Sequence, residues 1–162
     1  MFRLEPQTIE FADHAPLRVS DSAVVGAPRG RVFEAFADAG SWHRWFPLMT
    51  RSRWTTAETR RVGAEREVSL LAMGTFLERF IVWDADEHMA FTILTSSSPF
   101  ATGIVESFRF ADADGGRSTR VDWVLAARPR LVGKLLKPVL EATMRRVFRG
   151  SGPRLESYLK SR

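Results

Sequence analysis

Apolar and polar positions alternate differently in successive parts of the chain, and the changes divide the sequence into four regions. Residues 17–25 are typical of a β-strand, whereas apolar residues within 28–47 recur at helical spacing. From residue 49 to residue 127, short strand-like runs follow one another. From 131 to 160, helical spacing returns. The first 17 residues carry only a weak pattern, in which segment 8–11 predicts a short edge strand.

Two short helices are predicted after the first strand. The first, 28–40, begins with a proline, whose missing N–H would be unpaired in a first helical turn anyway, and it ends at a glycine. The second, 42–46, follows Ser41, a favourable N-cap residue, and ends before Pro47.

The middle of the chain predicts an antiparallel sheet. Glycine, proline, aspartate and serine clusters separate strand-length segments at 49–56, 64–72, 75–84, 87–96, 103–112 and 117–127. Consecutive strands joined by short turns form a meander. A strand, two helices, six strands and a long helix indicate an α+β fold, with a six- to seven-stranded sheet and the helix on one face.

The last thirty residues predict a long amphipathic helix. Its apolar face collects Leu140, Thr143, Met144, Val147, Phe148, Leu155, Tyr158 and Leu159. Its polar face collects Arg145, Arg146, Arg149, Glu156 and Lys160. Such an apolar stripe must be buried, and the sheet is the available partner. We expect the sheet to curve around this helix and to leave a ligand cavity between them.

Strand alternation predicts which side chains face the helix. The expected inward set is Val68, Leu70, Ala72, Met89, Phe91, Ile93, Ile104, Glu106, Phe108, Phe110, Val121, Trp123 and Leu125. Strand 75–84 is ambiguous, because both the face with Phe76 and Glu78 and the face with Leu77 and Arg79 are largely apolar. An apolar outer face predicts a covered surface there, for example in a homodimer.

Composition narrows the choice of protein class. A chain of 162 residues with 44% hydrophobic and 27% charged residues fits one globular domain, 1–162, in which 1–17 is an extension or edge strand. The absence of cysteine excludes disulfides and gives no sign of secretion. No apolar run approaches transmembrane length, so we expect a cytoplasmic protein.

The net charge of +5 gathers toward the C-terminal end of the chain. A solvated helix face explains this cluster without a nucleic-acid partner, and we expect no DNA binding. An RNA or ribosome contact remains an alternative interpretation.

Several segments resemble the START-like (SRPBCC, Bet v 1-like) superfamily, and within it the polyketide cyclase/dehydrase branch. They are VGAPRGRVFEAFAD at 25–38, WHRWFP at 42–47, GAEREV at 63–68, ERFIVWD at 78–84 and STRVDW at 118–123. The resemblance covers residues 19–160. It implies a helix-grip fold with an apolar cavity between the sheet and the last helix, and no cofactor. One departure is Gly150–Pro153, which predicts a kink in the terminal helix, either as a hinge at the cavity mouth or as a bend along the sheet.

Two carboxylates are the candidates for chemistry. Glu106 is predicted to lie inside the fold, where it could orient a ligand hydroxyl, act as a general acid or base, or pair with an arginine. Glu78 has the same alternatives with an uncertain orientation. The candidate ligand-binding residues are Trp45, Phe46, Phe80, Phe91, Glu106, Phe108, Trp123, Leu140, Met144 and Phe148. Three histidines without ligand spacing predict no metal site.

Three functions remain open on the sequence. The first is binding of a small hydrophobic ligand, such as a lipid-like, polyketide or aromatic molecule. The second is a cofactor-free cyclase, aromatase or dehydratase that uses Glu106 or Glu78. The third is a ribosome- or quinone-associated START-like protein, which the segment 45–47 faintly resembles.

Overall fold

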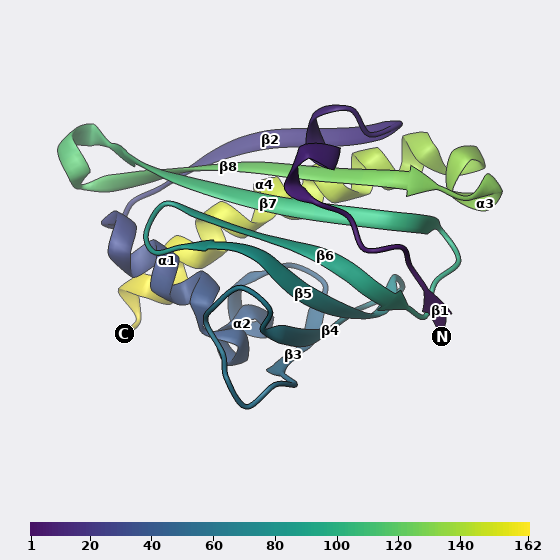
Figure 1. The fold of residues 1–162 in the computed structure, drawn as a ribbon. Coiled ribbons are helices and arrows are strands. Elements are labelled where there is room, and N and C mark those ends of the chain that lie inside the picture. The colour runs from purple at the N-terminus through teal and green to yellow at the C-terminus, as the bar shows by residue number, and fades with distance from the viewer.

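The computed structural model describes residues 1–162 and shows an antiparallel sheet curved around a long C-terminal helix (Figure 1). The strands are β1 (Phe2–Arg3), β2 (Leu17–Val25), β3 (Met49–Trp54), β4 (Glu65–Leu70), β5 (Gly74–Asp84), β6 (His88–Ser96), β7 (Ala101–Ala113) and β8 (Ser118–Pro129). The α-helices are α1 (Arg29–Ala37), α2 (Trp42–Trp45), α3 (Leu131–Leu135) and α4 (Lys137–Lys160). Short 3-10 helices occupy Ile9–Asp13, Ala39–Ser41 and Asp114–Gly116. The predicted α+β helix-grip fold is confirmed.

Seven strands follow the order β2-β8-β7-β6-β5-β4-β3, and β1 adds to β6. The first strand has the predicted bounds and pairs with β8 from Leu17 opposite Ala127 to Val25 opposite Thr119. Helices α1 and α2 lie at one end of the curved sheet, whereas α3 and the N-terminus lie at the other (Figure 1). Different elements therefore border the two ends of the interior.

The start of the chain fills a split in the sheet. Strands β6 and β7 pair only from His88 to Thr92 on the β6 side, and beyond that point they separate. The Leu4 N–H donates to the Leu94 carbonyl at 2.9 Å, and the Glu5 N–H donates to the Thr102 carbonyl at 2.7 Å. The N-terminal segment thus bridges both strands with backbone hydrogen bonds, and Leu4 is buried there.

The same segment covers part of the outer face of the sheet. The strand predicted at 8–11 is wrong, because Ile9–Asp13 forms a 3-10 helix that packs Phe11 and Ala12 on Val105 and Ala126. Ile81, on the ambiguous strand, packs against this cluster. The apolar outer surface is therefore covered in this region by the chain itself.

Three local predictions need correction. Helix α1 ends at Ala37, before Gly40. The Ser41 hydroxyl makes no N-cap bond, because it donates to the Ala35 and Asp38 carbonyls instead. Ala72 does not face the helix: it lies exposed in the β4–β5 turn with a positive φ of 63°.

The C-terminal helix also differs from prediction. Leu136 separates α3 from α4, whereas α4 continues through Gly150–Pro153 without interruption. Pro153 has no N–H to donate to the carbonyl of residue 149, four positions earlier. A Cβ built on Gly152 would lie 3.4 Å from the Ala23 Cβ, so the glycine permits close approach of α4 to β2. The segment therefore packs on β2, and none of its residues lines the apolar pocket described below.

Candidate functional site

A pocket of about 120 Å³ lies between the sheet and the first turns of α4. Fourteen of its 19 lining residues are hydrophobic: Leu4, Leu17, Val19, Val68, Leu70, Met73, Phe76, Ile93, Phe100, Ala101, Ile104, Leu125, Leu140 and Met144. The polar ones are Glu78, Ser96, Ser98, Glu106 and Glu141. For scale, an engineered apolar cavity of about 150 Å³ admits benzene. The pocket therefore has room for the apolar part of a small molecule.

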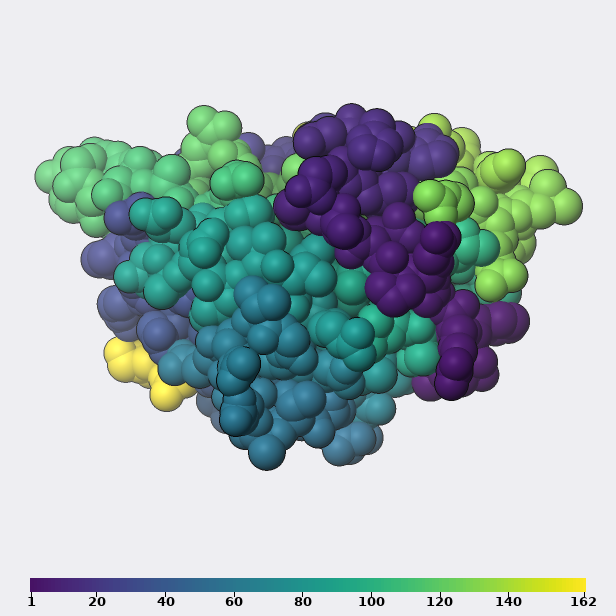
Figure 2. Space-filling model, in the orientation of Figure 1, coloured from purple at the N-terminus to yellow at the C-terminus, as the bar shows by residue number.

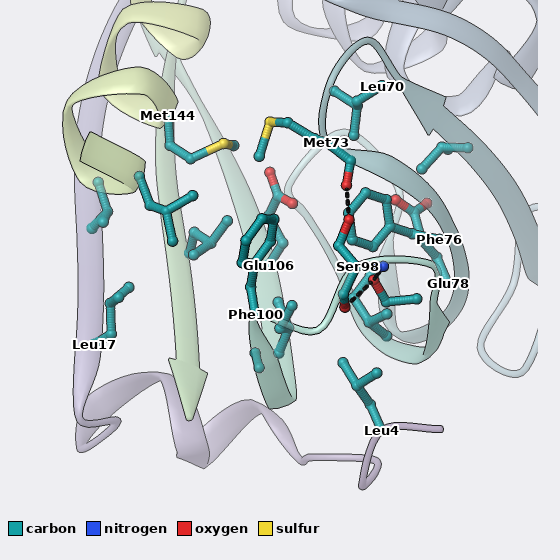
Figure 3. Close-up of a pocket in the computed structure, with 18 of the residues that line it drawn as sticks. Leu4, Leu17, Leu70, Met73, Phe76, Glu78, Ser98, Phe100, Glu106 and Met144 are labelled. Carbon is teal, nitrogen blue, oxygen red and sulfur yellow. Dashed lines mark hydrogen bonds between the residues drawn. The ribbon is translucent and has the colours of Figure 1, made fainter. Parts of the chain in front are cut away.

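We place the mouth of the pocket at the partly exposed lining residues that lie outside the sheet, because the other partly exposed ones, Leu70, Phe76, Ile104, Glu106 and Leu125, belong to strands. The mouth residues come from the β4–β5 turn (Met73), the β6–β7 loop (Ser98 and Phe100) and the start of α4 (Leu140 and Glu141). Figure 3 shows the side chains of Met73 and Met144 pointing toward one another from opposite walls. Unbranched methionine side chains adapt to irregular shapes, so this rim can accommodate different ligands.

Glu106 is the carboxylate that the pocket holds without a cationic partner. It points inward from β7, as alternation predicts, and its Oε1 accepts a hydrogen bond from Trp123 Nε1 at 2.6 Å. Burial raises the pKa of Glu106 to about 7, and the nearby Glu78 charge adds to this rise. The Trp123 bond favours the ionised form and limits the rise. Near neutral pH, Glu106 can therefore either donate or accept a proton.

Glu78 also points inward, but it belongs to a buried ion pair. Arg66 Nε donates to Glu78 Oε2 at 2.7 Å, and both side chains are almost wholly buried. Burial raises the pKa of Glu78, and the Arg66 guanidinium opposes that rise. Because a guanidinium keeps its proton in proteins, we assign the compensating negative charge to Glu78.

Arg66 is held by aromatic rings rather than by water. Its Cζ lies 4.4 Å from the Trp42 ring centroid, 5.2 Å from that of Phe80 and 5.4 Å from that of Phe91. Its two terminal nitrogens have no hydrogen-bond partner. The rings offer the cation a favourable electrostatic surface where a hydrogen-bond acceptor is absent. The Arg66–Glu78 pair is thus embedded in the packed core, with only Glu78 reaching the pocket.

Sequence reasoning missed Arg66. Strand alternation would have found it, because Arg66 shares the inward face of β4 with Val68 and Leu70. It pairs across the sheet with Glu78, directly opposite on β5.

The predicted ligand-binding residues separate into two groups. Glu106, Leu140 and Met144 line the pocket. The aromatic residues do not line it; they pack in the hydrophobic core: Trp45, Phe46, Phe80, Phe91, Phe108, Trp123 and Phe148. Edge-to-face and tilted ring contacts link Trp45, Phe46 and Phe108 to Phe36 or Trp42 and join Phe80 through Phe91 to Phe108, while Trp123 stacks on Phe148 at 4.9 Å. Trp45 and Phe46 are therefore core residues and not a lid.

Thr143, on the predicted apolar face of α4, and Ser151, next to Gly150, do not line the pocket. The Ser151 hydroxyl donates to the Phe148 carbonyl at 2.6 Å, so it is used within the helix. No group of three or more histidine, aspartate or glutamate side chains is arranged to hold a metal ion. None of the helices is long and apolar enough to span a bilayer.

A curved antiparallel sheet that grips a C-terminal helix over an apolar pocket defines a START-like domain. The chain belongs to the family described as "Polyketide cyclase / dehydrase and lipid transport", whose model matches residues 16–160. The superfamily and branch predicted from the sequence are therefore confirmed.

One relative resembles the chain in sequence, and two solved structures resemble it in fold. A protein of Mycobacterium tuberculosis, described as uncharacterized, is 28% identical over 155 residues, which cover 92% of this chain and 90% of the relative. An aromatase/cyclase from a Streptomyces species has the same fold with a TM-score of 0.73 and 16% identity, over 89% of this chain and 93% of that one. A START superfamily protein from Mycobacterium smegmatis gives a TM-score of 0.65 at 15% identity, over 89% and 97% of the two chains.

Proposed function

We propose that this protein binds a small hydrophobic molecule in the pocket between the sheet and α4, with a polar group of the ligand directed at Glu106. The observation that carries the proposal is a mostly apolar pocket in which one carboxylate has no cationic partner. Burial of apolar ligand surface supplies the driving force, at roughly 25 cal/mol per Å². The family description and the fold of the aromatase/cyclase support a ligand of this kind.

The charges of the pocket lining determine which kind of polar group a ligand can place beside Glu106. Its ionisable residues are Glu78, Glu106 and Glu141, and it contains no lysine or arginine. Glu78 is paired with Arg66, and Glu141 lies 3.8 Å from Lys137. A ligand carboxylate would meet Glu106 without a compensating cation, which is unfavourable in a buried site. A hydroxyl or another neutral polar group suits the pocket better.

Calorimetric titration with 1-octanol and with octanoate at pH 8 tests this proposal. We expect octanol to bind and octanoate to bind at least about tenfold more weakly, because the pocket offers its carboxylate no partner. Ile104→Trp should fill the pocket and abolish octanol binding. Val24→Trp, at an exposed position of β2, serves as the control and should leave it unchanged. Tighter binding of octanoate, or binding that survives Ile104→Trp, would overturn the proposal.

A second function, acid–base catalysis in the same pocket, is favoured by one observation. Glu106 combines an open position in the pocket with a pKa of about 7. A carboxylate of this kind can take a proton from the carbon beside a ketone and return it to oxygen during cyclisation or dehydration. Glu106→Gln should then abolish turnover of a β-hydroxyketone while octanol binding persists. Turnover that is unaffected by this substitution would leave binding as the function.

A further inference from the structure

Exposed aliphatic side chains gather at the end of the molecule that carries the pocket mouth. Leu131, Leu135 and Val139 are 74%, 74% and 63% exposed. Leu131 and Leu135, four residues apart, share one side of α3, and Val139 lies on the first turn of α4, just after the break at Leu136. Large exposed apolar patches are uncommon on monomeric proteins and mark interaction surfaces.

The N-terminus lies beside this stripe. Arg130, directly before α3, places its Cζ 5.7 Å from the ring centroid of Phe2, and Phe2 itself is partly exposed. Helix α3 rests on the β6–β7 loop, where a Cβ at Gly133 would lie 2.1 Å from the Phe100 carbonyl oxygen. Figure 2 shows the light-green α3 region projecting at the same end of the molecule as the purple N-terminal residues.

Basic side chains accompany the apolar ones. Residues 128–140 contain four lysines and arginines and no acidic residue. Arg128 pairs with Glu5, and Lys137 lies 3.8 Å from Glu141. Arg130 and Lys134 form no ion pair, so the surface retains an uncompensated positive charge.

We infer that this surface, which consists of the stripe Leu131, Leu135 and Val139 with Arg130 and Lys134, docks on a lipid bilayer that contains anionic lipids. Aliphatic side chains beside basic ones match the boundary between acyl chains and negatively charged headgroups. A second copy of this chain fits less well, because a symmetric contact would bring the same uncompensated positive charges together.

The docking surface lies next to the pocket mouth along the chain. Val139 is exposed in the stripe, and the next residue, Leu140, lines the pocket mouth. Docking would therefore hold the pocket mouth near the bilayer, where a hydrophobic ligand has a short path between the two. This last step rests on the proposed function, whereas docking itself does not require any ligand.

Sedimentation with vesicles tests the inference on the full chain without added ligand. We expect binding to phosphatidylcholine vesicles that contain phosphatidylglycerol, weakening as salt increases. The double variant Leu131→Ser/Leu135→Ser should lose about tenfold or more in partitioning, because it removes apolar groups from the boundary. Lys134→Glu should lose at least about fivefold.

The matched control is Val24→Ser, since Val24 is 63% exposed but lies on β2. It should bind vesicles as the unsubstituted protein does, and circular dichroism should show all variants folded. No binding to anionic vesicles, or equal loss in the control, would overturn the inference. So would a dimer in ultracentrifugation that the double variant dissociates, if no vesicles are bound.

The proposed ligand binding and the inferred bilayer docking can be tested independently of each other. Ile104→Trp fills the pocket and should abolish octanol binding, yet it should leave vesicle binding intact because Ile104 is not part of the docking surface.

Discussion

The interior between the sheet and α4 has two halves that differ in packing. Toward α1 and α2, Phe36 contacts the rings of Trp42, Trp45, Phe108 and Phe110 at 4.9–5.2 Å between centroids, and this half is solid. Toward α3, mostly aliphatic side chains and methionines, together with the rings of Phe76 and Phe100, surround a pocket. Large rigid rings fill one half and stabilise the fold, while shorter side chains from the same sheet leave the other half open for a ligand.

The two inward carboxylates follow the same division. Glu78 is tied to Arg66, which the rings of the solid half enclose. Glu106 has Trp123 as its hydrogen-bond donor and no paired cation. The solid half therefore fixes the charge of one carboxylate, and the hollow half leaves the other able to change its protonation state.

The largest expected effect comes from the solid half. Phe36→Ala should lower the free energy of unfolding by about 3–5 kcal/mol, because it opens a cavity among four rings. Leu140→Ala, at the half-exposed mouth, should cost about 1 kcal/mol or less, since an empty pocket already adjoins it. Urea unfolding measures both. Equal losses would mean that the two halves do not differ in packing.

The next effect concerns the buried ion pair. Arg66→Met should destabilise the protein by about 3 kcal/mol, because it leaves Glu78 buried without a countercharge. The double variant Arg66→Met/Glu78→Gln should recover most of this loss. Urea unfolding of the double-mutant cycle gives the coupling. If the double variant is as unstable as the single one, Arg66 acts through packing on its aromatic neighbours and not through charge.

The hollow half should respond to pH through Glu106. Its pKa is raised in the folded state from 4.5 to about 7, so the folded protein binds the proton more tightly than the unfolded chain. The stabilisation that protonated Glu106 gives the folded state is complete below about pH 4.5 and is lost as pH rises through 7. Between pH 4.5 and 8, the free energy of unfolding of the unsubstituted protein should fall by up to about 3 kcal/mol relative to that of Glu106→Gln. Unfolding of both proteins across this range checks the slope, and parallel curves would contradict it.

The smallest effect is expected from filling the pocket. Ile104→Phe should change the free energy of unfolding by no more than about 1 kcal/mol, in the stabilising direction, because it occupies empty space. Phe108→Trp, a similar enlargement in the solid half, should destabilise by about 1–3 kcal/mol because no space is available. Thermal unfolding distinguishes the two. Destabilisation by Ile104→Phe would mean that the pocket wall is rigid and closed to larger groups.

Regular periodicity made the fold predictable. The bounds of β2 match the prediction, and the inward positions of Glu106, Phe108 and Trp123 follow directly from alternation. Alternation also places Arg66 on the inward face of β4. A charged residue between two glutamates, however, is expected to face water. Its cross-strand partner Glu78 and the surrounding rings of Trp42, Phe80 and Phe91 explain its burial.

Other features depend on contacts that the sequence pattern does not encode. Alternation states which side of the sheet a ring faces, but not whether the rings of separate elements fill the space between them. Phe80, Phe91 and Phe108 were therefore predicted as pocket residues and lie in the solid core. The pairing of β1 with β6 likewise joins residues more than ninety positions apart, without a turn to indicate it.

Methyl NMR during a titration with 1-octanol tests most directly whether the hollow half is a binding site. Methyl signals of Ile104, Leu125 and Met144, which line the pocket, should shift together and saturate. Those of Val32 and Met89, fully buried outside the pocket lining, should stay in place. Shifts confined to Val32 and Met89, or no saturable shift at any of these methyl groups, would contradict the account.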